Sequence, residues 1–541
     1  MQKGGFSMLR NFFFYRKKER RYEFSLSPST QKAPSAAPDG FKPVDTDISK
    51  NLEYVKRVLS LPQNGDIILR EFEVSANGGA YRAFLINAEG VSRTDSINVS
   101  ILRPLMELSH AKIDSKLTTL DFIYNRLLSH NQARKEPDIN KLIEAVHFGN
   151  AILMVDTLDT GFLIDVKGWE HRTVGEPKNE AVVQGPHEGF NEMLRSNTAL
   201  IRKTINNSNL VMENIPLGKT GKTASALCYL KNVANDGLVD EVRRRMREID
   251  VEYLLSSLDL EQYIEEASFL SLPQTITTER PDRACRALVE GRVVIVVNGS
   301  SHVLILPATV FDLASSPEDE YLRFPYAILV RVVRIAAMFI AMLFPAVFLA
   351  VTNFHQELIL SDILYAIASS RMSVPFPALV ELLLMELSFE LIKEAGIRVP
   401  GPIGPALGIV GGLILGQAAV SAGIVSPIMI IVVAVTGIAS FAIPSYSLSF
   451  AFRFTRFLYL AVAAMAGFLG IFSLLFIQAL TVLNTKSFGV PFTSPVAPRG
   501  KEGIMRLLFT APVWKGDTRP SYLDQKDREE RGKWSRKWMK K

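Results

Sequence analysis

The sequence predicts a multi-domain membrane protein, in which a cytosolic pair of α/β subdomains precedes a bundle of four to five transmembrane helices. The first observation is length, because 541 residues exceed one ordinary globular core. The second is a mixture of alternating and helical spacing of apolar residues before about residue 315. The third is a block of 151 residues, 335–485, with only 11 charged side chains. Together they exclude both a purely soluble and a purely membrane-embedded protein.

Shifts in composition divide the chain into five segments. Residues 1–46 form a basic leader rich in Pro and Ser, which we expect to be disordered. Residues 47–170 and 171–315 are the two α/β subdomains, separated at the turn-rich stretch 168–185. Residues 316–485 form the transmembrane domain, and residues 486–541 form a basic cytoplasmic tail.

Apolar periodicity predicts the elements of each subdomain. In the first subdomain we expect strands at 66–74, 80–87, 151–155 and 161–166, and helices at 97–108 and 116–128. In the second we expect helices at 188–205 and 240–248, and strands at 210–215, 224–230, 293–297 and 303–306. No repeat of 20–50 residues is apparent, which excludes a solenoid.

The charge-poor block predicts four spans. Residues 335–351, with the partly apolar run before them, and residues 457–485 are each long enough to cross a hydrocarbon core of about 30 Å. The 54 uncharged residues 399–452 accommodate two spans with a turn near 423–427. Residues 378–395 carry glutamates and are predicted to be re-entrant or buried. A fifth span there would place Arg453 and Arg456 inside but move the basic tail outside.

The net charge of +6 belongs to the tail, which carries +8 from residue 486 onward. A nucleic-acid-binding protein would present a basic stripe on a folded domain, so we expect no nucleic-acid partner. A basic segment directly after an apolar span indicates the cytoplasmic side instead. The N-terminus does not have the residue order of a signal peptide, so the N-terminal domain is also expected in the cytoplasm.

The sequence predicts no enzyme, no cofactor and no metal site. The run 218–223, GKTGKT, fails as a phosphate-binding loop because Pro216 and Glu213 stand where that loop requires glycine. The seven histidines lack the spacing of zinc ligands. Cys228 and Cys285 are the only cysteines, which excludes a disulfide scaffold and indicates buried, reduced thiols.

The candidate functional residues lie in the charge-poor block. As a helix, residues 375–396 place Glu386, Glu390 and Glu394 on one stripe, whereas Glu381 faces elsewhere and Lys393 could pair with Glu390. Ionisable groups at membrane depth usually face a cavity, a pore or a partner charge, so a carboxylate-lined cation path is one reading. An interfacial helix with its acids in water is the other.

A face of small residues follows the glutamates. It permits close approach of helices, either within one subunit or around an oligomeric pore. Its residues are Gly404, Gly408, Gly412 and Gly416, and they are followed by the polar Gln417.

Several long segments resemble the A subunits of GerA-family spore germinant receptors. They are QGPHEGFNEMLRSNTALIRK (184–203), TERPDRACRALVEGRVVIVVNG (278–299), PEDEYLRFPYAILVRVVRIAAM (317–338), HQELI (355–359), SRMSVPFPALVELLLMELSFELIKEAGIRVPGPIG (370–404), GIVGGLILGQAAVSAGIVSPIMIIVVA (408–434) and SFGVPFTSPVAP (487–498). The cytosolic signature residues among them are Gly185, Pro186, Glu188, Gly189, Phe190, Glu279, Arg280, Pro281 and Asp282.

The resemblance implies a multi-pass protein of the spore inner membrane. It implies that the chain senses nutrients together with a permease-like B subunit and a lipoprotein C subunit. It also implies contact with membrane lipids and a homo-oligomeric ring that conducts monovalent cations. A non-conducting scaffold that organises receptor clusters is the alternative. A secondary transporter is disfavoured because such folds usually carry repeated sets of spans.

Overall fold

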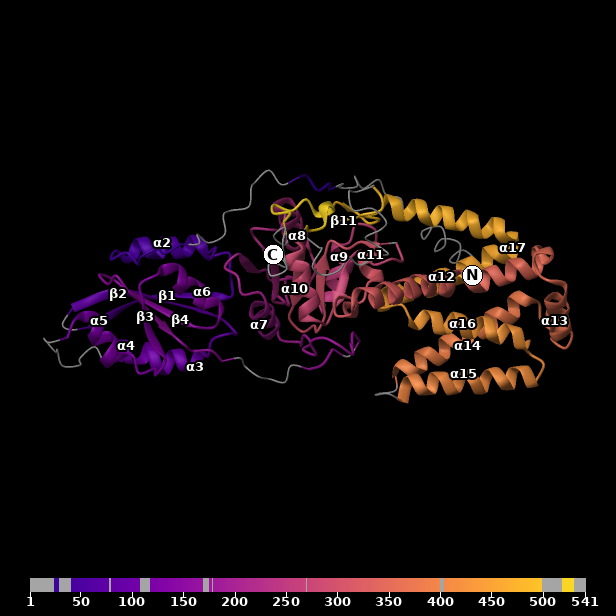
Figure 1. The fold of residues 1–541 in the computed structure, drawn as a ribbon, viewed down its shortest axis with the longest axis horizontal. Helices are drawn as coiled ribbons and strands as arrows, with labels where there is room; N and C mark the ends of the chain where they lie inside the picture. The colour runs from indigo at the N-terminus through magenta and orange to yellow at the C-terminus, as the bar shows by residue number, and fades with distance from the viewer. Residues whose placement is uncertain are drawn as a thin grey trace, which may run out of the picture.

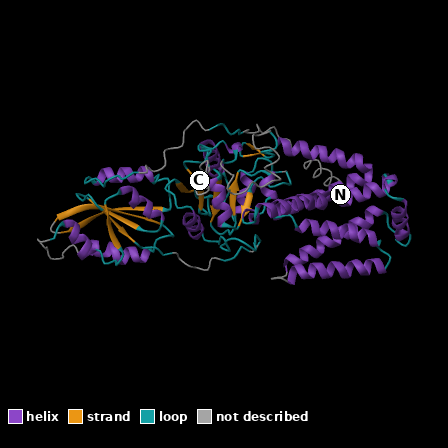
Figure 2. Ribbon diagram, viewed as in Figure 1, coloured by secondary structure: helices purple, strands orange, loops and turns teal. Residues whose placement is uncertain are grey.

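Three regions follow one another along the chain in the computed structural model, which describes residues 24–28, 40–76, 79–107, 117–168, 175–177, 179–268, 270–398, 403–498 and 518–529. Figure 1 shows two α/β units side by side and a helical region beyond the second unit. Strands occur in both α/β units, and long helices form the rest (Figure 2). The predicted fold class is therefore confirmed.

The first α/β unit is a five-stranded antiparallel sheet between two layers of helices. The strand order is β1-β2-β4-β5-β3. The strands are β1 (Ile67–Ala76), β2 (Gly79–Ala88), β3 (Ala133–Glu136), β4 (Ala151–Val155) and β5 (Gly161–Ile164). One face packs on α2 (Ile48–Val58) and α6 (Ile139–His147). The other packs on α3 (Thr94–Ile97), η1 (Asn98–Leu102), α4 (Arg103–Glu107), α5 (Thr119–Phe122) and η3 (Ile123–Leu127).

The second unit repeats this topology, with the strand order β6-β7-β9-β10-β8. Its strands are β6 (Leu210–Asn214), β7 (Ser225–Leu230), β8 (Ile276–Thr278), β9 (Val293–Val297) and β10 (Val303–Leu306). One face packs on α7 (Leu194–Thr204) and α10 (Pro281–Val289), the other on α8 (Asp236–Glu248) and α9 (Ser257–Ile264). Both units thus have a hairpin, helices, an edge strand, one helix and a second hairpin, in that order.

The helix predicted over 188–205 begins later, at Leu194. In the six residues before it, backbone amides form hydrogen bonds outside a helix. The Phe190 amide donates to the Glu279 carbonyl at 2.7 Å, and the Asn191 amide donates to the Asn197 side chain at 2.9 Å. Such local hydrogen bonds compete with a helical backbone.

A buried arginine joins the two α/β units. Arg202 of α7 is fully buried and forms two hydrogen bonds with the Asp66 carboxylate, the one from Nη2 at 3.0 Å. Its Nη1 lies 3.0 Å from Nδ1 of His147, and Nη2 also donates to the Leu210 carbonyl at 3.1 Å. Burial and the Arg202 charge lower the pKa of His147 to about 3, so this histidine is neutral. We call these four residues the inter-unit clamp.

Segments from both ends of the chain are docked on the second unit. The Asn235 side-chain amide donates to the carbonyl of Ser27 at 3.0 Å and to that of Asp524 at 2.9 Å. Leu523, in the short helix η7 (Ser521–Leu523), is fully buried. The hairpin of β11 (Lys486–Ser487) and β12 (Val490–Pro491) also packs there through Phe488. Parts of the leader and of the basic tail thus belong to the folded structure.

The helical region begins after α11 (Val310–Ala314) and η4 (Pro317–Glu320). Its helices are α12 (Phe324–Phe354), η5 (Gln356–Leu358), α13 (Ser361–Arg371), α14 (Ala378–Arg398), α15 (Ile403–Ser421), α16 (Pro427–Phe441) and α17 (Tyr446–Asn484). In the described residues, α12 and α17 are long and apolar enough to cross a membrane by length and composition. The turn predicted near 423–427 lies between α15 and α16. The Glu-bearing element predicted at 378–395 is one continuous helix, α14, in which Glu381 and Glu386 are buried.

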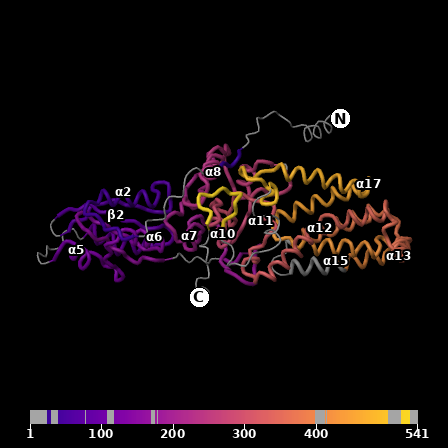
Figure 3. The backbone as a smooth tube through the Cα atoms, turned by 45° about the horizontal axis from the view of Figure 1, so that its top comes forward, coloured from indigo at the N-terminus to yellow at the C-terminus, as the bar shows by residue number. Residues whose placement is uncertain are grey.

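The single span predicted at 457–485 is wrong. Gly467, with φ 55° and ψ −135°, breaks α17 into two legs, 446–466 and 468–484. The Tyr459 hydroxyl donates to Gln478 at 2.6 Å, which shows that the second leg folds back along the first. Only glycine adopts this backbone conformation readily, and a run of uncharged residues gives no other sign of a turn. The tube in Figure 3 follows the legs as they run away from the second α/β unit and return.

Candidate functional site

Two candidate glutamates of α14 form a buried charge cluster with α17. Glu386 is fully buried, and its Oε2 lies 2.9 Å from Nη2 of Arg456, which is itself 1% exposed. Glu390 pairs with both arginines: Arg456 Nη2 lies 2.8 Å from its Oε1, and Arg453 Nε lies 3.0 Å from the same atom. The predicted pairing of Lys393 with Glu390 is wrong, because Lys393 donates to the Ser440 hydroxyl of α16. We call these five charged residues the charge cluster.

Helix geometry explains why these side chains meet. Residues four apart on α14 and three apart on α17 each lie on one helix face. The first leg of α17 runs antiparallel to α14, so Arg453 lies beside Glu390 and Arg456 beside Glu386. A four-span topology places Arg453 and Arg456 outside the membrane and predicts no contact between them and the glutamates of α14. The available signal was two arginines at helical spacing in an otherwise uncharged stretch.

The other two glutamates of α14 lie outside the cluster. Glu381 is fully buried nearer the opposite end of the helix, where its Oε1 accepts hydrogen bonds from the amide and hydroxyl of Ser426. Its Oε2 lies 3.7 Å from Nε of Arg371. Glu394 is exposed near the end of α14. The predicted stripe is therefore divided among a buried carboxylate, Glu386, a partly buried one, Glu390, and an exposed one, Glu394.

The small-residue face of α15 is partly used within the chain. A Cβ added to Gly416 would meet Ile430 of α16 at 3.4 Å, whereas one added to Gly412 would meet nothing within 4 Å. Gln417 is exposed. The surroundings of Gly408 and Gly404 fall outside the described residues. One part of this face thus supports packing of α15 on α16, and another part is open.

The signature residues of the α/β units converge on a fully buried arginine. Arg280 directly precedes Pro281, the first residue of α10. Its Nη2 donates to the Asp282 carboxylate at 2.8 Å and to the Pro186 carbonyl at 3.0 Å. The Gly189 amide donates to the Gly175 carbonyl at 2.8 Å, and Phe190 lies in the core. Glu188 forms an exposed ion pair with Lys203. Segments about 90 residues apart in sequence are thereby fixed to each other.

The same cluster of residues reaches the start of α12. The Tyr321 hydroxyl donates to Asp282, and the Tyr321 ring covers Gly185, where a Cβ would lie 2.9 Å from it. Asp319 is buried and pairs with Arg334 of α12 through hydrogen bonds of 2.7 and 2.9 Å. We call Arg280, Asp282, Asp319, Tyr321 and Arg334 the membrane junction. These contacts tie the second unit to the base of α12.

A family model described as Bacillus/Clostridium GerA spore germination protein matches residues 53–522. The chain belongs to the GerA family. It is 36% identical to spore germination protein KA of Bacillus subtilis (strain 168) over 490 residues, 91% of this chain and 89% of the relative. It is 34% identical to spore germination protein GerLA of Bacillus cereus over 462 residues, 85% of this chain and 93% of the relative.

Among solved structures, the N-terminal domain of the A subunit of the Bacillus megaterium spore germinant receptor GerK3 aligns with 49% of this chain and 96% of its own. The identity is 25% and the TM-score 0.38. The family predicted from the sequence is confirmed by the family match and the relatives. The chain is a spore germination receptor A subunit, and its apolar helices give it membrane character.

One residue of the GerA-family signature, Glu279, forms a pH-sensitive pair with His302. Nε2 of His302 lies 3.1 Å from the Glu279 carboxylate, and the hydrogen bond to Glu279 raises the pKa of His302. Burial would raise the pKa of Glu279, but hydrogen bonds from His302 and Asn179 outweigh it and lower the pKa to about 2. The geometry therefore favours the charged form of both partners.

We expect this pair to make stability depend on pH in two windows. The histidine contribution is complete below its ordinary pKa of 6.5 and is lost as the pH rises through the raised pKa. The glutamate contribution is complete above 4.5 and is lost as the pH falls towards 2. Thermal unfolding of the wild type and His302→Gln between pH 5 and 9 measures the first window. Identical pH profiles for both proteins would contradict the assignment.

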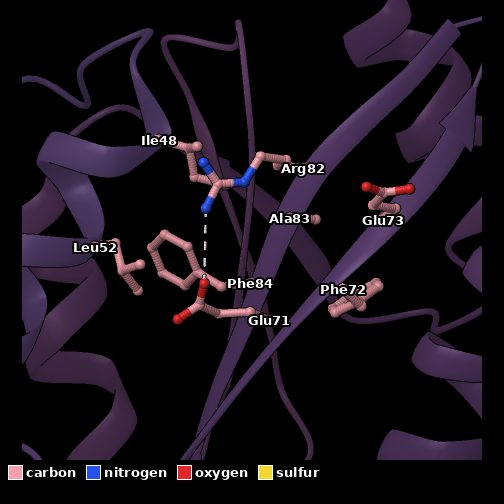
Figure 4. A pocket seen from close by; sticks show the side chains of 8 residues that line it. All are labelled: Ile48, Leu52, Glu71, Phe72, Glu73, Arg82, Ala83 and Phe84. Carbon is pink, nitrogen blue, oxygen red and sulfur yellow. Dashed lines mark ion pairs between the residues drawn. The ribbon is translucent and has the colours of Figure 1, made fainter.

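The first α/β unit of this GerA-family chain has a small pocket between α2 and the β1–β2 hairpin (Figure 4). Its volume is about 190 Å³. The Glu71 carboxylate in its wall lies 3.8 Å from Arg82 and 3.1 Å from Lys56. Because the Glu71 carboxylate already faces two cations, Arg82 of the lining and Lys56, we do not regard this pocket as the functional site. In the part of the chain that the structure describes, no three His, Cys, Asp or Glu side chains are grouped to hold a metal.

Proposed function

We propose that this A subunit forms a nutrient-gated, cation-conducting oligomer in the spore inner membrane. It would act with a permease-like B subunit and a lipoprotein C subunit, with its α/β units and tail on the core side. The observation that carries the proposal is the buried charge cluster between α14 and α17. Burying ionisable groups among apolar helices is costly, and such groups usually mark ion paths or movable contacts.

The ion pairs of the cluster support a closed state. Glu386 and Glu390 are held by Arg456 and Arg453, so their oxygens are not available to a passing cation. Separation of α14 from the first leg of α17 would release these carboxylates, which suit monovalent cations as oxygen ligands. A nutrient signal on a partner would need to favour the separated state by its differential affinity for the two states.

The membrane junction provides a route for that signal. Arg334 lies in the first three turns of α12 and is held by Asp319, so a shift of the second α/β unit moves the base of α12. The α12 helix in turn packs against α17 through Ala346, Leu349 and Leu460. A movement of the cytosolic units therefore reaches the helix that carries both arginines of the cluster.

We expect Glu386→Gln and Glu390→Gln to slow potassium release from germinating spores by about tenfold, because each removes one carboxylate that would line the open path. Glu357→Gln, an exposed acid on η5 outside the cluster, is the matched control. Potassium release is followed after nutrient addition, and protein levels are checked by immunoblot. Unchanged release by both cluster variants at normal protein levels would exclude the carboxylate path.

A non-conducting scaffold is the second candidate. The cluster contains three cations and two carboxylates, Lys393 included, so it suits an internal lock better than an open cation path. The purified chain alone, reconstituted in vesicles and assayed for ion flux, separates the two functions. Flux that the cluster variants alter supports the channel, whereas vesicles that stay tight favour the scaffold.

A further inference from the structure

The connection between α12 and α14 exposes apolar side chains at the end of the helical region away from the α/β units. It comprises η5, the helix α13 and the loops on either side. Only Ile367 of α13 is buried, whereas Leu360 is 74% exposed, Ile363 51% and Met372 88%. Figure 1 shows α13 lying across the ends of the long helices rather than along them. In water this surface would be unfavourable.

Geometry limits the depth at which this connection can lie. The 11 residues of α13 span about 16 Å, roughly half of the hydrocarbon thickness, so α13 cannot cross a bilayer. The chain is not α-helical at 355–360 and 372–377, and lipid-exposed backbone of this kind is excluded from the hydrocarbon core. The connection therefore belongs at the boundary between water and lipid.

The turn of α17 lies at the same level. A Cβ added to Gly467 would meet Phe354 at 3.0 Å, and the ring of His355 lies 4.9 Å from that of Phe468. The exposed Leu469 and Phe472 of the second leg continue the apolar surface from the connection onto the long helices. Lipid that surrounds the long helices would therefore also contact the connection.

Helical spacing gives α13 two different sides. At 100° per residue, Asp362 and Ser369 lie within about 20° of each other, and Leu360 and Ile367 lie on the opposite side within about 20°. Arg371 at the end of α13 faces Glu381 at 3.7 Å, so the bundle holds the apolar side inward. Leu360 is on that side and yet exposed, which means that it extends beyond the rim of the bundle.

We propose that α13 and its flanking loops form an interfacial helix that inserts shallowly into the lipid leaflet opposite the α/β units. Leu360 and Ile363 would enter the acyl region, and Asp362 and Ser369 would face water. Exposed apolar side chains on a helix too short to span, flanked by non-helical backbone, fit a segment that lies in the membrane surface. The inference requires a membrane-inserted chain and does not depend on ion conduction.

The test uses full-length Leu360→Trp in phosphatidylcholine–phosphatidylglycerol vesicles that contain lipids brominated near the headgroup or deep in the acyl chain. Fluorescence of the wild type, with its four tryptophans, is subtracted. We expect a blue-shifted emission that shallow bromines quench at least twofold more than deep bromines. Leu255→Trp, 64% exposed on the second α/β unit, is the matched control and should remain unquenched.

Phe472→Trp shows whether the protein is inserted, because this side chain is 65% exposed on the second leg of α17 and should be quenched. If Phe472→Trp is quenched and Leu360→Trp is not, the apolar surface of α13 is not covered by lipid and the proposal is wrong. That result would point to a protein partner on this surface and would leave the cation-channel proposal unaffected.

Discussion

Arg456→Met is expected to destabilise the protein by about 3–5 kcal/mol, the usual cost of removing one partner of a buried ion pair. Arg456 is 1% exposed and contacts both Glu386 and Glu390. Glu390 keeps Arg453, but Glu386 loses the only ion pair that it has in the described residues. The expected result is a large fall in the thermal unfolding temperature of the detergent-solubilised protein.

The double variant Arg456→Met with Glu386→Gln distinguishes an uncompensated charge from lost packing. Removing both charges should recover a large part of the stability, because the remaining cost is that of a neutral buried amide. Equal destabilisation by the single and double variants would show that Glu386 does not depend on Arg456.

Arg202→Met is expected to release the two α/β units from each other and to cost about 3–5 kcal/mol. Asp66 would remain buried without its cation, beside a His147 that burial keeps neutral. Hydrogen exchange should rise at the Gly65 amide, which donates to the Met212 carbonyl across the unit boundary at 2.8 Å.

The control is Arg195→Met on the same helix. Arg195 also bridges the units, through Glu89, but it is 57% exposed, and exposed ion pairs contribute little. We expect its exchange and unfolding to match the wild type. If both variants behaved alike, the clamp would have no special role in joining the units.

Local patterns predicted most of the α/β secondary structure. The hairpin at 66–87, the strands at 151–166 and the pair 293–306 follow from alternation of apolar residues and from turn residues, which act over a few positions. The common topology of the two units was not predicted. The two units share a strand order although their residues differ, so a comparison of their sequences does not show the common topology.

The candidate site was predicted in part. Spacing placed Glu386 and Glu390 on one side of a helix, and the structure brings both into the charge cluster. Their arginine partners are more than 60 residues away, and the turn at Gly467 changes the path of α17. Pairing between distant helices depends on tertiary packing, which periodicity within one helix does not describe.

The inter-unit clamp and the membrane junction together turn the two α/β units into a lever. Its pivot is at Asp319 and Arg334, and the first α/β unit is the free end of its arm. Because the first unit lies farthest from Asp319 and Arg334, a small force applied there exerts a larger torque on α12 than the same force applied near the junction. In the oligomer proposed above, contacts between the first units of neighbouring subunits would act on α12 through the longest arm.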